Sequence, residues 1–258
     1  MQHVVHPLAL HIQAVKRRLL IIGATVVGSL VLTFTFSSEM VAWLNRPFPN
    51  QLAFYGPTEA LFASIKVSLL AAVILSLPVI FYQCWKFIEP ALLPTEQRWA
   101  IPLFMIAGGL FALGLVFCNV VILPLVIEWF VSFGLDRDIT PELSVGTYID
   151  FNVKFLLIFG CAFELPLVMT LAAMTGFASA HTFARYRKHA ILLCLIISAV
   201  VTPDATLFTM LLMAVPLMAL YEVGILGARL FGRNPTHRDV DLPLDPDLPI
   251  KTAGTRVR

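Results

Sequence analysis

An uncharged, mostly apolar run at residues 19–36 places the strongest constraint on how this chain can fold. A helix of about 20 such residues crosses the roughly 30 Å hydrocarbon core of a bilayer. Within that core a helix satisfies all of its own backbone hydrogen bonds. Similar runs recur along the chain, and only 13% of its residues are charged, against roughly 25% in soluble domains. We therefore predict an all-α membrane protein.

The first run could belong either to a signal peptide or to a first transmembrane helix, because Lys16, Arg17 and Arg18 come directly before it. Its 18 residues exceed the apolar region of a signal peptide, which holds about 7–15. The sequence Ser37-Ser38-Glu39 that follows offers no small-x-small cleavage pattern. We predict a first span with its N-terminus inside the cell.

Six spans are predicted in all, joined by polar segments. They are residues 19–36, 59–81, 99–123, 148–175, 190–201 and 207–230. The segment 37–58 is extramembrane with one short amphipathic helix, and 124–147 is a second polar connection. We treat residues 1–232 as one six-span transmembrane domain, and 233–258, which carries four prolines, as a disordered cytoplasmic tail.

The fifth run, 190–201, is only 12 residues long, about 18 Å of helix, so one kinked helix or two short ones would both fit the last part of the chain. Charge decides between them. With six alternating spans, 14 of the 18 Lys and Arg residues fall on the side of the N-terminus, as the positive-inside rule requires. We therefore predict two short last helices and cytoplasmic N- and C-termini.

Ionisable residues inside the predicted spans are costly and are candidates for function. Glu164, followed by Pro166, lies about two-thirds of the way along the fourth span. We interpret Glu164 as a polar spot on a water-accessible inner face, the alternative being a carboxyl group hydrogen-bonded to a neighbouring helix. Lys66 and Lys154 lie near the outer ends of their spans, where snorkelling to the interface explains them.

No known catalytic motif is present: the sequence lacks HExxH, GxSxG, a Walker loop and a His/Cys cluster at metal-ligand spacing. We therefore predict a protein that is not an enzyme and that needs no cofactor or metal. The energy for its function must then come from an ion gradient or from a partner protein.

Residues 78–98 connect the second and third spans and combine aromatic with acidic side chains. Glu89 and Glu96 lie close in sequence to Trp85 and Phe87. This composition favours a docking surface for a cationic, partly apolar ligand. The alternative is a hairpin loop anchored by its interfacial aromatics.

Several motifs occur in an order and spacing specific to one family. They are Gly56-Pro57-Thr58-Glu59-Ala60, Lys66-Val67-Ser68-Leu69, the run from Pro78 to Leu92, Phe163-Glu164-Leu165-Pro166, Arg185-Tyr186-Arg187-Lys188, Thr202-Pro203 and Leu220-Tyr221-Glu222. Through these motifs the chain, up to about Gly232, resembles the TatC family, the multi-spanning receptor subunit of the twin-arginine protein translocase.

The resemblance implies a concave six-helix bundle in the bacterial cytoplasmic (inner) membrane. Such a protein binds twin-arginine signal peptides and hands folded cargo to single-span subunits of the TatA and TatB type, driven by the proton-motive force. It implies self-association in a receptor complex and contact with membrane lipids, with no nucleic-acid partner.

The family's functional positions map onto this sequence as follows. The signal-peptide site comprises the tip of the first span (Lys16 and Arg17), the loop aromatic Phe87, with Trp85 as a second stacking candidate, and the loop carboxylate Glu96. The outer-loop proline maps to Pro47. Polar intramembrane or partner contacts map to Gln83, Glu164 and Asp204. A carboxylate such as Glu96 can pair bidentately with a guanidinium, which distinguishes Arg from Lys.

One departure from the family affects this site. The family writes the first tip as His-Leu-x-Glu-Leu-Arg-x-Arg, whereas here Ala14 stands at the glutamate position and Lys16 at the next arginine. Two arginines of a signal peptide would therefore meet one family carboxylate. Our hypothesis is that Glu89 binds the second guanidinium; the rival is that selectivity is relaxed in this chain.

A secondary transporter of a small solute is the alternative function, because short helices and a midplane acid such as Glu164 also occur in transporters. Against it, the sequence shows no internal repeat and no second interrupted helix in its first half.

Overall fold

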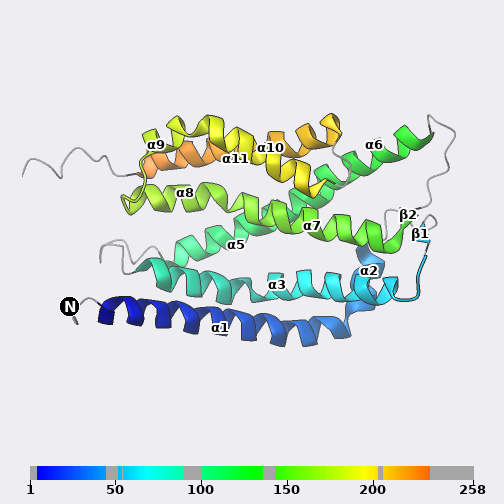
Figure 1. The fold of residues 1–258 in the computed structure, drawn as a ribbon, viewed down its shortest axis with the longest axis horizontal. Coiled ribbons are helices and arrows are strands. Elements are labelled where there is room, and N and C mark those ends of the chain that lie inside the picture. The colour runs from blue at the N-terminus through cyan, green and yellow to red at the C-terminus, as the bar shows by residue number, and fades with distance from the viewer. Residues whose placement is uncertain are drawn as a thin grey trace, which may run out of the picture.

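The computed structural model describes residues 5–44, 52–53, 55–89, 100–135, 143–202 and 206–232. Within these ranges the regular structure is helical apart from one short parallel strand pair (Figure 1). Strand β1 (Leu52–Ala53) pairs with β2 (Leu143–Ser144) and joins two connections at one end of the molecule. The prediction of an all-α protein is confirmed for the described residues.

The helices follow one another back and forth along the long axis of the molecule (Figure 1). Their bounds are α1 (Val5–Thr35), α2 (Ser37–Leu44), α3 (Glu59–Ile88), α5 (Ala100–Phe117), the π-helical turn η2 (Cys118–Ile122), α6 (Leu123–Leu135), α7 (Val145–Phe163), α8 (Leu165–Met174), α9 (Ala180–Arg185), α10 (Arg187–Val201) and α11 (Leu207–Phe231).

Five segments of the described chain are long and apolar enough to cross a membrane. They are Val15–Thr35, Glu59–Phe87, Pro102–Ser132, Val145–Met174 and Leu207–Phe231. Helix α10 has 15 residues, or about 22 Å, and is short as predicted. Helix α11 has 25 residues, so the prediction that both last helices are short is wrong for α11.

Two predicted loops are partly helical. Helix α3 continues to Ile88 because no glycine or proline occurs between Pro78 and Pro90. Residues 82–88 of the predicted loop therefore extend the helix. The third span continues through Pro124 to Leu135, although we predicted a polar connection from residue 124. The wide η2 turn directly precedes Pro124 and gives room for a ring that would clash with a carbonyl in a regular helix.

Small and hydroxylated residues let neighbouring helices approach closely, the usual means of packing in a bilayer. Thr33 of α1 donates to the Ser68 carbonyl of α3 (2.9 Å), and Ser76 donates to Ser29 (3.1 Å). Gly114 of α5 lies against the Phe159 backbone of α7. These contacts hold α1 antiparallel to α3 and α5 against α7.

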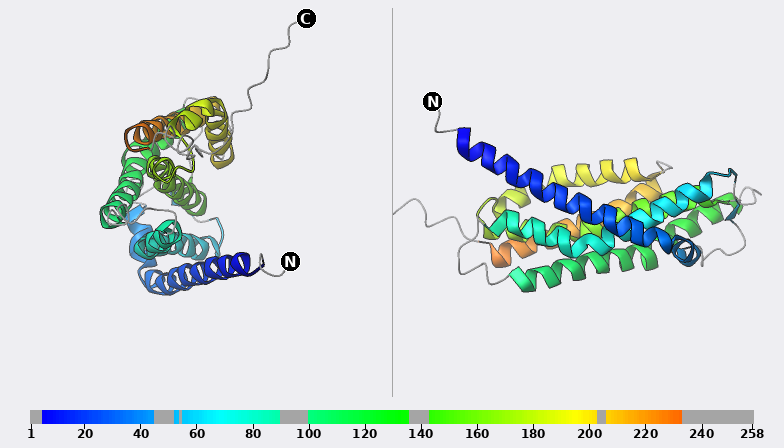
Figure 2. Two further views of the ribbon diagram at one scale, coloured as in Figure 1. Left: turned by 90° about the vertical axis from the view of Figure 1, so that its left-hand side faces the viewer. Right: turned by 90° about the horizontal axis from the view of Figure 1, so that it is seen from below.

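Seen end-on, the helices follow an open curve rather than a closed ring (Figure 2, left). The start of α1 and the ends of α3, α8 and α11 lie at the same end of the molecule (Figure 1). Helix α9 and the start of α10 lie at this end too (Figure 1). The basic residues of these segments are Lys16, Arg17, Arg18, Lys86, Arg185, Arg187, Lys188 and Arg229.

Candidate functional site

The first part of α1 and the last part of α3 lie side by side and form what we call the α1–α3 rim, residues 13–18 and 82–89. The antiparallel pairing of Ser29 with Ser76 brings residues near 18 level with residues near 87. Arg18 and Phe87 are in contact at this level. The rim therefore joins two segments that are about 70 residues apart in the sequence.

Arg18 lies over the aromatic ring of Phe87. Its guanidinium carbon is 5.8 Å from the ring centroid, a distance at which a cation is attracted by the ring. The Nη1 atom of Arg18 is buried without a hydrogen-bond partner among the described residues. The Phe87 side chain is still 53% exposed, so this ring presents a surface that holds a guanidinium.

The remaining rim residues differ in exposure. Lys86 lies over the Tyr82 ring, with Nζ 5.1 Å from the centroid. Gln83 and Glu89 are half-buried, and Glu89 ends α3, its N–H donating to the Trp85 carbonyl. Trp85 itself is only 9% exposed, so its ring packs within the protein and is not presented for stacking.

The structure brings together five of the residues predicted for the signal-peptide site: Lys16 and Arg17, both exposed, lie on α1, and Trp85, Phe87 and Glu89 lie on α3. Glu96, Pro47 and Asp204 lie outside the described residues. Sequence reasoning missed Arg18 as the partner of Phe87. A signal was available, because a basic cluster before one span and an aromatic cluster after the next meet at one end of a helical hairpin.

Glu164 forms the joint between α7 and α8. The helix is broken there, and the Glu164 N–H donates to the carbonyls of Ala162 and Cys161 because Pro166 supplies no donor. Its Oε1 atom is buried without a hydrogen-bond partner among the described residues. An unsatisfied buried oxygen costs about 1–3 kcal/mol, so this position favours a partner that donates a hydrogen bond.

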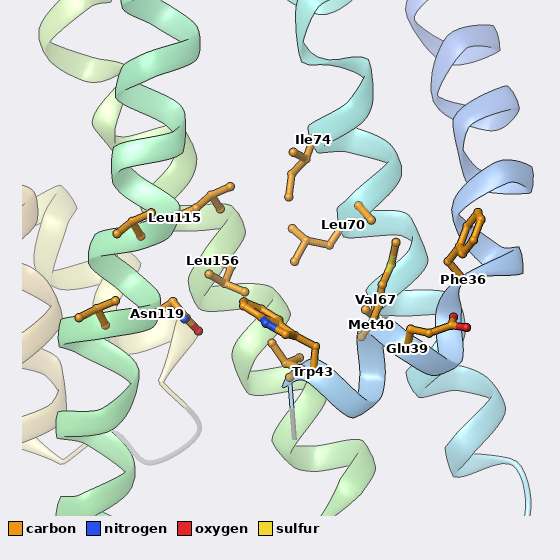
Figure 3. A pocket seen from close by; sticks show the side chains of 14 residues that line it. Phe36, Glu39, Met40, Trp43, Val67, Leu70, Ile74, Leu115, Asn119 and Leu156 are labelled. Atoms are coloured by element: carbon orange, nitrogen blue, oxygen red, sulfur yellow. The ribbon is translucent and has the colours of Figure 1, made fainter. Parts of the chain in front are cut away.

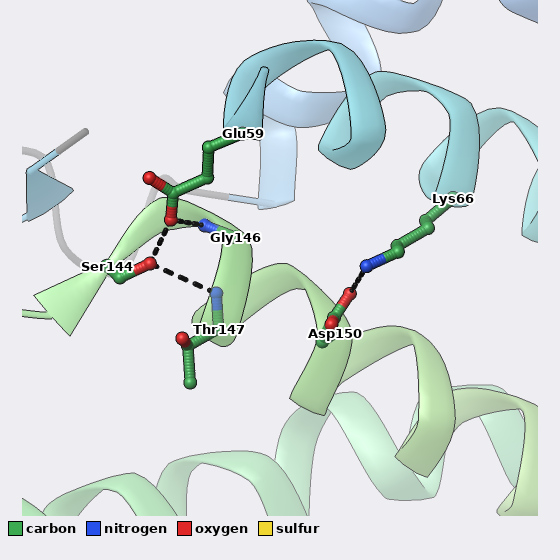
Figure 4. Close-up of polar contacts among 6 residues, drawn as sticks. All are labelled: Glu59, Lys66, Ser144, Gly146, Thr147 and Asp150. Carbon is green, nitrogen blue, oxygen red and sulfur yellow. Dashed lines mark hydrogen bonds and ion pairs between the residues drawn. The ribbon is translucent and has the colours of Figure 1, made fainter. Parts of the chain in front are cut away.

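At the opposite end, Glu59 organises the strand pair and the start of α7 (Figure 4). It accepts hydrogen bonds from the N–H groups of Gly146 and Tyr55, each at 2.8 Å, and from the Ser144 hydroxyl. Ser144 in turn caps α7 by accepting from the Thr147 N–H. Glu59 thus connects the start of α3 to the strand pair and to the start of α7.

Lys66 of α3 forms an ion pair with Asp150 of α7 (Figure 4). We predicted that snorkelling to the interface explains Lys66, and the structure adds that its ammonium group is held by a carboxylate from another helix. Lys66 lies about two turns and Asp150 about one and a half turns from the N-terminal ends of α3 and α7, and both helices begin at the same end of the molecule (Figure 1).

Helix α11 is tied to α10 and α9 by polar contacts. Arg187 donates to Glu222 (2.8 Å), and the Tyr221 hydroxyl donates to the Phe183 carbonyl (2.9 Å). Among the described residues no group of three or more His, Cys, Asp or Glu side chains could hold a metal ion.

Comparison with known proteins places this geometry in a family. The family model for the Sec-independent protein translocase protein (TatC) matches residues 10–216. The TatC protein of Aquifex aeolicus is 38% identical over 234 residues, covering 88% of this chain and 96% of that protein. The TatC protein of Campylobacter jejuni is 34% identical, covering 90% and 97%.

A crystal structure of the twin arginine translocase receptor TatC also superposes on this chain. The TM-score is 0.79 at 36% sequence identity, with 86% of this chain and 100% of the other covered. Fold, length and sequence therefore agree over almost the whole described region.

Proposed function

The chain belongs to the TatC family of Sec-independent protein translocase proteins, and from that premise we propose that it binds twin-arginine signal peptides and exports folded proteins using the proton-motive force. As a TatC protein it is a multi-pass inner-membrane component of the Tat translocase and not an enzyme. Membership of this family points to protein transport and away from the alternative function of a small-solute transporter.

The proposed topology has six spans with both termini in the cytoplasm. It counts the five long apolar segments and adds the 15-residue α10 as a short fifth crossing. The gathering of basic residues at the end where α1 begins and α11 ends supports this orientation.

The α1–α3 rim is the proposed signal-peptide site, and the exposed Phe87 ring with a guanidinium on its face carries the proposal. An arginine of a signal peptide can take the position that Arg18 takes over Phe87, and stacking of this kind is worth about 0.5–1 kcal/mol at exposed sites. Glu89, two residues further on, and Glu96 supply the carboxylates. Trp85 is buried, so its proposed role is to pack behind the rim residues.

Site-specific photo-crosslinking tests this site. A photoreactive residue at position 87, 89 or 96 should label a precursor with a twin-arginine signal peptide much more strongly than the same precursor with twin lysines. The physical reason is that a planar guanidinium stacks and pairs bidentately, whereas an ammonium does not. Equal labelling of both precursors, or of neither, would contradict the assignment.

The role of Glu89 needs its own test, because Ala14 stands where the family has a glutamate. The variant Glu89→Gln keeps the shape of the side chain and removes its charge. We expect reduced transport of a twin-arginine reporter, by up to about five-fold for a surface pair of 0–1 kcal/mol. Unchanged transport would favour the rival hypothesis of relaxed selectivity.

Single-span subunits of the TatA and TatB type are the proposed partners, together with further copies of the chain. Glu164 is the proposed contact for a polar side chain of a partner helix, because its Oε1 atom is buried and has no hydrogen-bond partner among the described residues. Gln83 and Asp204 are proposed as further polar contacts, and Pro47 as a structural element of the outer loop.

A further inference from the structure

A large cavity lies between α2, α3, α5, η2 and α7, away from the α1–α3 rim (Figure 3). Its volume is about 720 Å³. Most of its walls belong to the segments 59–87, 102–132 and 145–174, which are long and apolar enough to cross a membrane. Val116 and Val120 of its lining are more than half exposed, so the cavity opens on a side that faces the bilayer.

The few polar residues of this cavity lie toward one end of it, among apolar side chains (Figure 3). Glu39, Trp43 and Asn119 lie toward one end, and Ile74 and Leu115 lie toward the other. Glu39 and Trp43 come from α2, the short helix that follows the outer end of α1, and tryptophan is typical of the membrane interface. The cavity is therefore apolar along most of its length, with its few polar groups at the end near the membrane surface.

One lipid acyl chain is the occupant that a bilayer supplies directly. Half a hydrocarbon core is about 15 Å deep, and an acyl chain reaches that depth and is far thinner than a helix, which is about 10–12 Å wide.

Charge narrows the class of lipid. Glu39 is the one charged residue among the fourteen that line the cavity in the described part of the chain. Its carboxylate suits an ammonium head group and repels a purely anionic one. Trp43 and Asn119 add hydrogen-bond donors, which suit the phosphate and ester oxygens of a phospholipid.

We propose that this cavity binds one aminophospholipid, with an acyl chain against Val67, Ile74 and Leu156 and the ammonium group at Glu39. Asn119 stands in the π-helical turn η2, and turns of this kind often occur at functional sites. The site is separate from the signal-peptide rim and does not depend on its function.

Native mass spectrometry of the full-length protein tests the proposal. The protein is reconstituted in nanodiscs with equal amounts of phosphatidylethanolamine and phosphatidylglycerol and transferred into mild detergent. The mass of the protein with any bound lipid is then measured. We expect one phosphatidylethanolamine per chain to be retained. The variant Glu39→Gln should lower the preference over phosphatidylglycerol by up to about five-fold.

Two variants that fill the cavity, Ile74→Trp and Val116→Trp, should each lose the retained lipid. Leu113→Trp is the matched control, because Leu113 is on the same helix as Val116 and equally exposed (56% and 57%) but does not line the cavity. Circular dichroism measures helical content as a check on folding. Because Val116 is exposed, Val116→Trp should fold even if Ile74→Trp does not. Lipid retention in both filled variants, equal retention of phosphatidylglycerol, or a second protein chain in place of the lipid would overturn the proposal.

Discussion

At the scale of single residues, Arg18 covers the ring that the signal peptide is proposed to use. Its guanidinium lies 5.8 Å from the Phe87 centroid, so an incoming arginine competes with it. We predict that Arg18→Gln raises the affinity for a twin-arginine signal peptide by about two- to five-fold, the equivalent of one exposed cation–π contact. Fluorescence anisotropy with a labelled signal peptide measures the change.

The control for this prediction is Arg17→Gln, which removes the same charge from an exposed neighbour on α1. If the gain comes from uncovering Phe87, Arg17→Gln has the smaller effect at the same salt concentration. Equal gains in both variants would mean that general charge repulsion, and not the ring, is responsible.

Residue types could be assigned from the sequence more readily than their partners. Glu164 and Phe87 were identified because each breaks the local pattern, as an acid in an apolar run and an aromatic beside glutamates. The ion pair of Lys66 with Asp150 joins residues 84 positions apart, and its formation depends on how α3 and α7 dock. Periodicity within one span carries no information on that docking.

At the scale of helices, the contact of α5 with α7 depends on Gly114. A Cβ atom added there would lie 2.7 Å from the Phe159 carbonyl oxygen, and a backbone atom cannot move aside alone. We predict that Gly114→Ala destabilises the protein by about 1–3 kcal/mol, as overpacking does. A lower midpoint of thermal unfolding in detergent shows it.

Gly109, on the same helix, is the matched comparison. A Cβ there meets nothing within 4 Å, so Gly109→Ala keeps the packing and adds helix propensity worth up to about 1 kcal/mol. Its unfolding midpoint should stay the same or rise. A drop of equal size in both variants would show that α5 tolerates no added methyl group anywhere and would contradict the packing argument.

Helix positions were predictable from the sequence, whereas their ends were less so. The apolar runs located each span, but α3 extends past Phe81 to Ile88 and α6 extends to Leu135. The polar and aromatic residues 82–88 of α3 remain helical because no glycine or proline stops them, and the third span continues through Pro124 into α6. Hydropathy therefore marks the membrane and not the helix end. Helix α2 was expected because segment 37–58 could bury one apolar face.

At the scale of the whole molecule, the helices follow an open curve (Figure 2). This shape explains why so many large apolar side chains remain exposed on the surface of the protein. Val31, Val200 and Leu207 are each more than 70% exposed. In a bilayer such residues face lipid or a partner helix at no cost in hydration. The sequence predicted the class of protein from composition, but the curve depends on contacts between distant segments and needed the structure.

Helix α10 decides the topology of the entire chain. Its 15 residues reach about 22 Å, less than the roughly 30 Å of a bilayer core, so crossing requires local thinning of the bilayer.

If α10 does cross, Thr206 lies outside the cell and the C-terminus inside. In a chain whose four native cysteines are replaced, we predict that Thr206→Cys reacts with a membrane-impermeant maleimide added to intact spheroplasts. Thr58→Cys should react likewise, and His181→Cys only after lysis. Protection of Thr206→Cys alongside labelled Thr58→Cys would place both ends of α10 on one side and leave the basic end of α11 outside, against the charge distribution that the whole topology depends on.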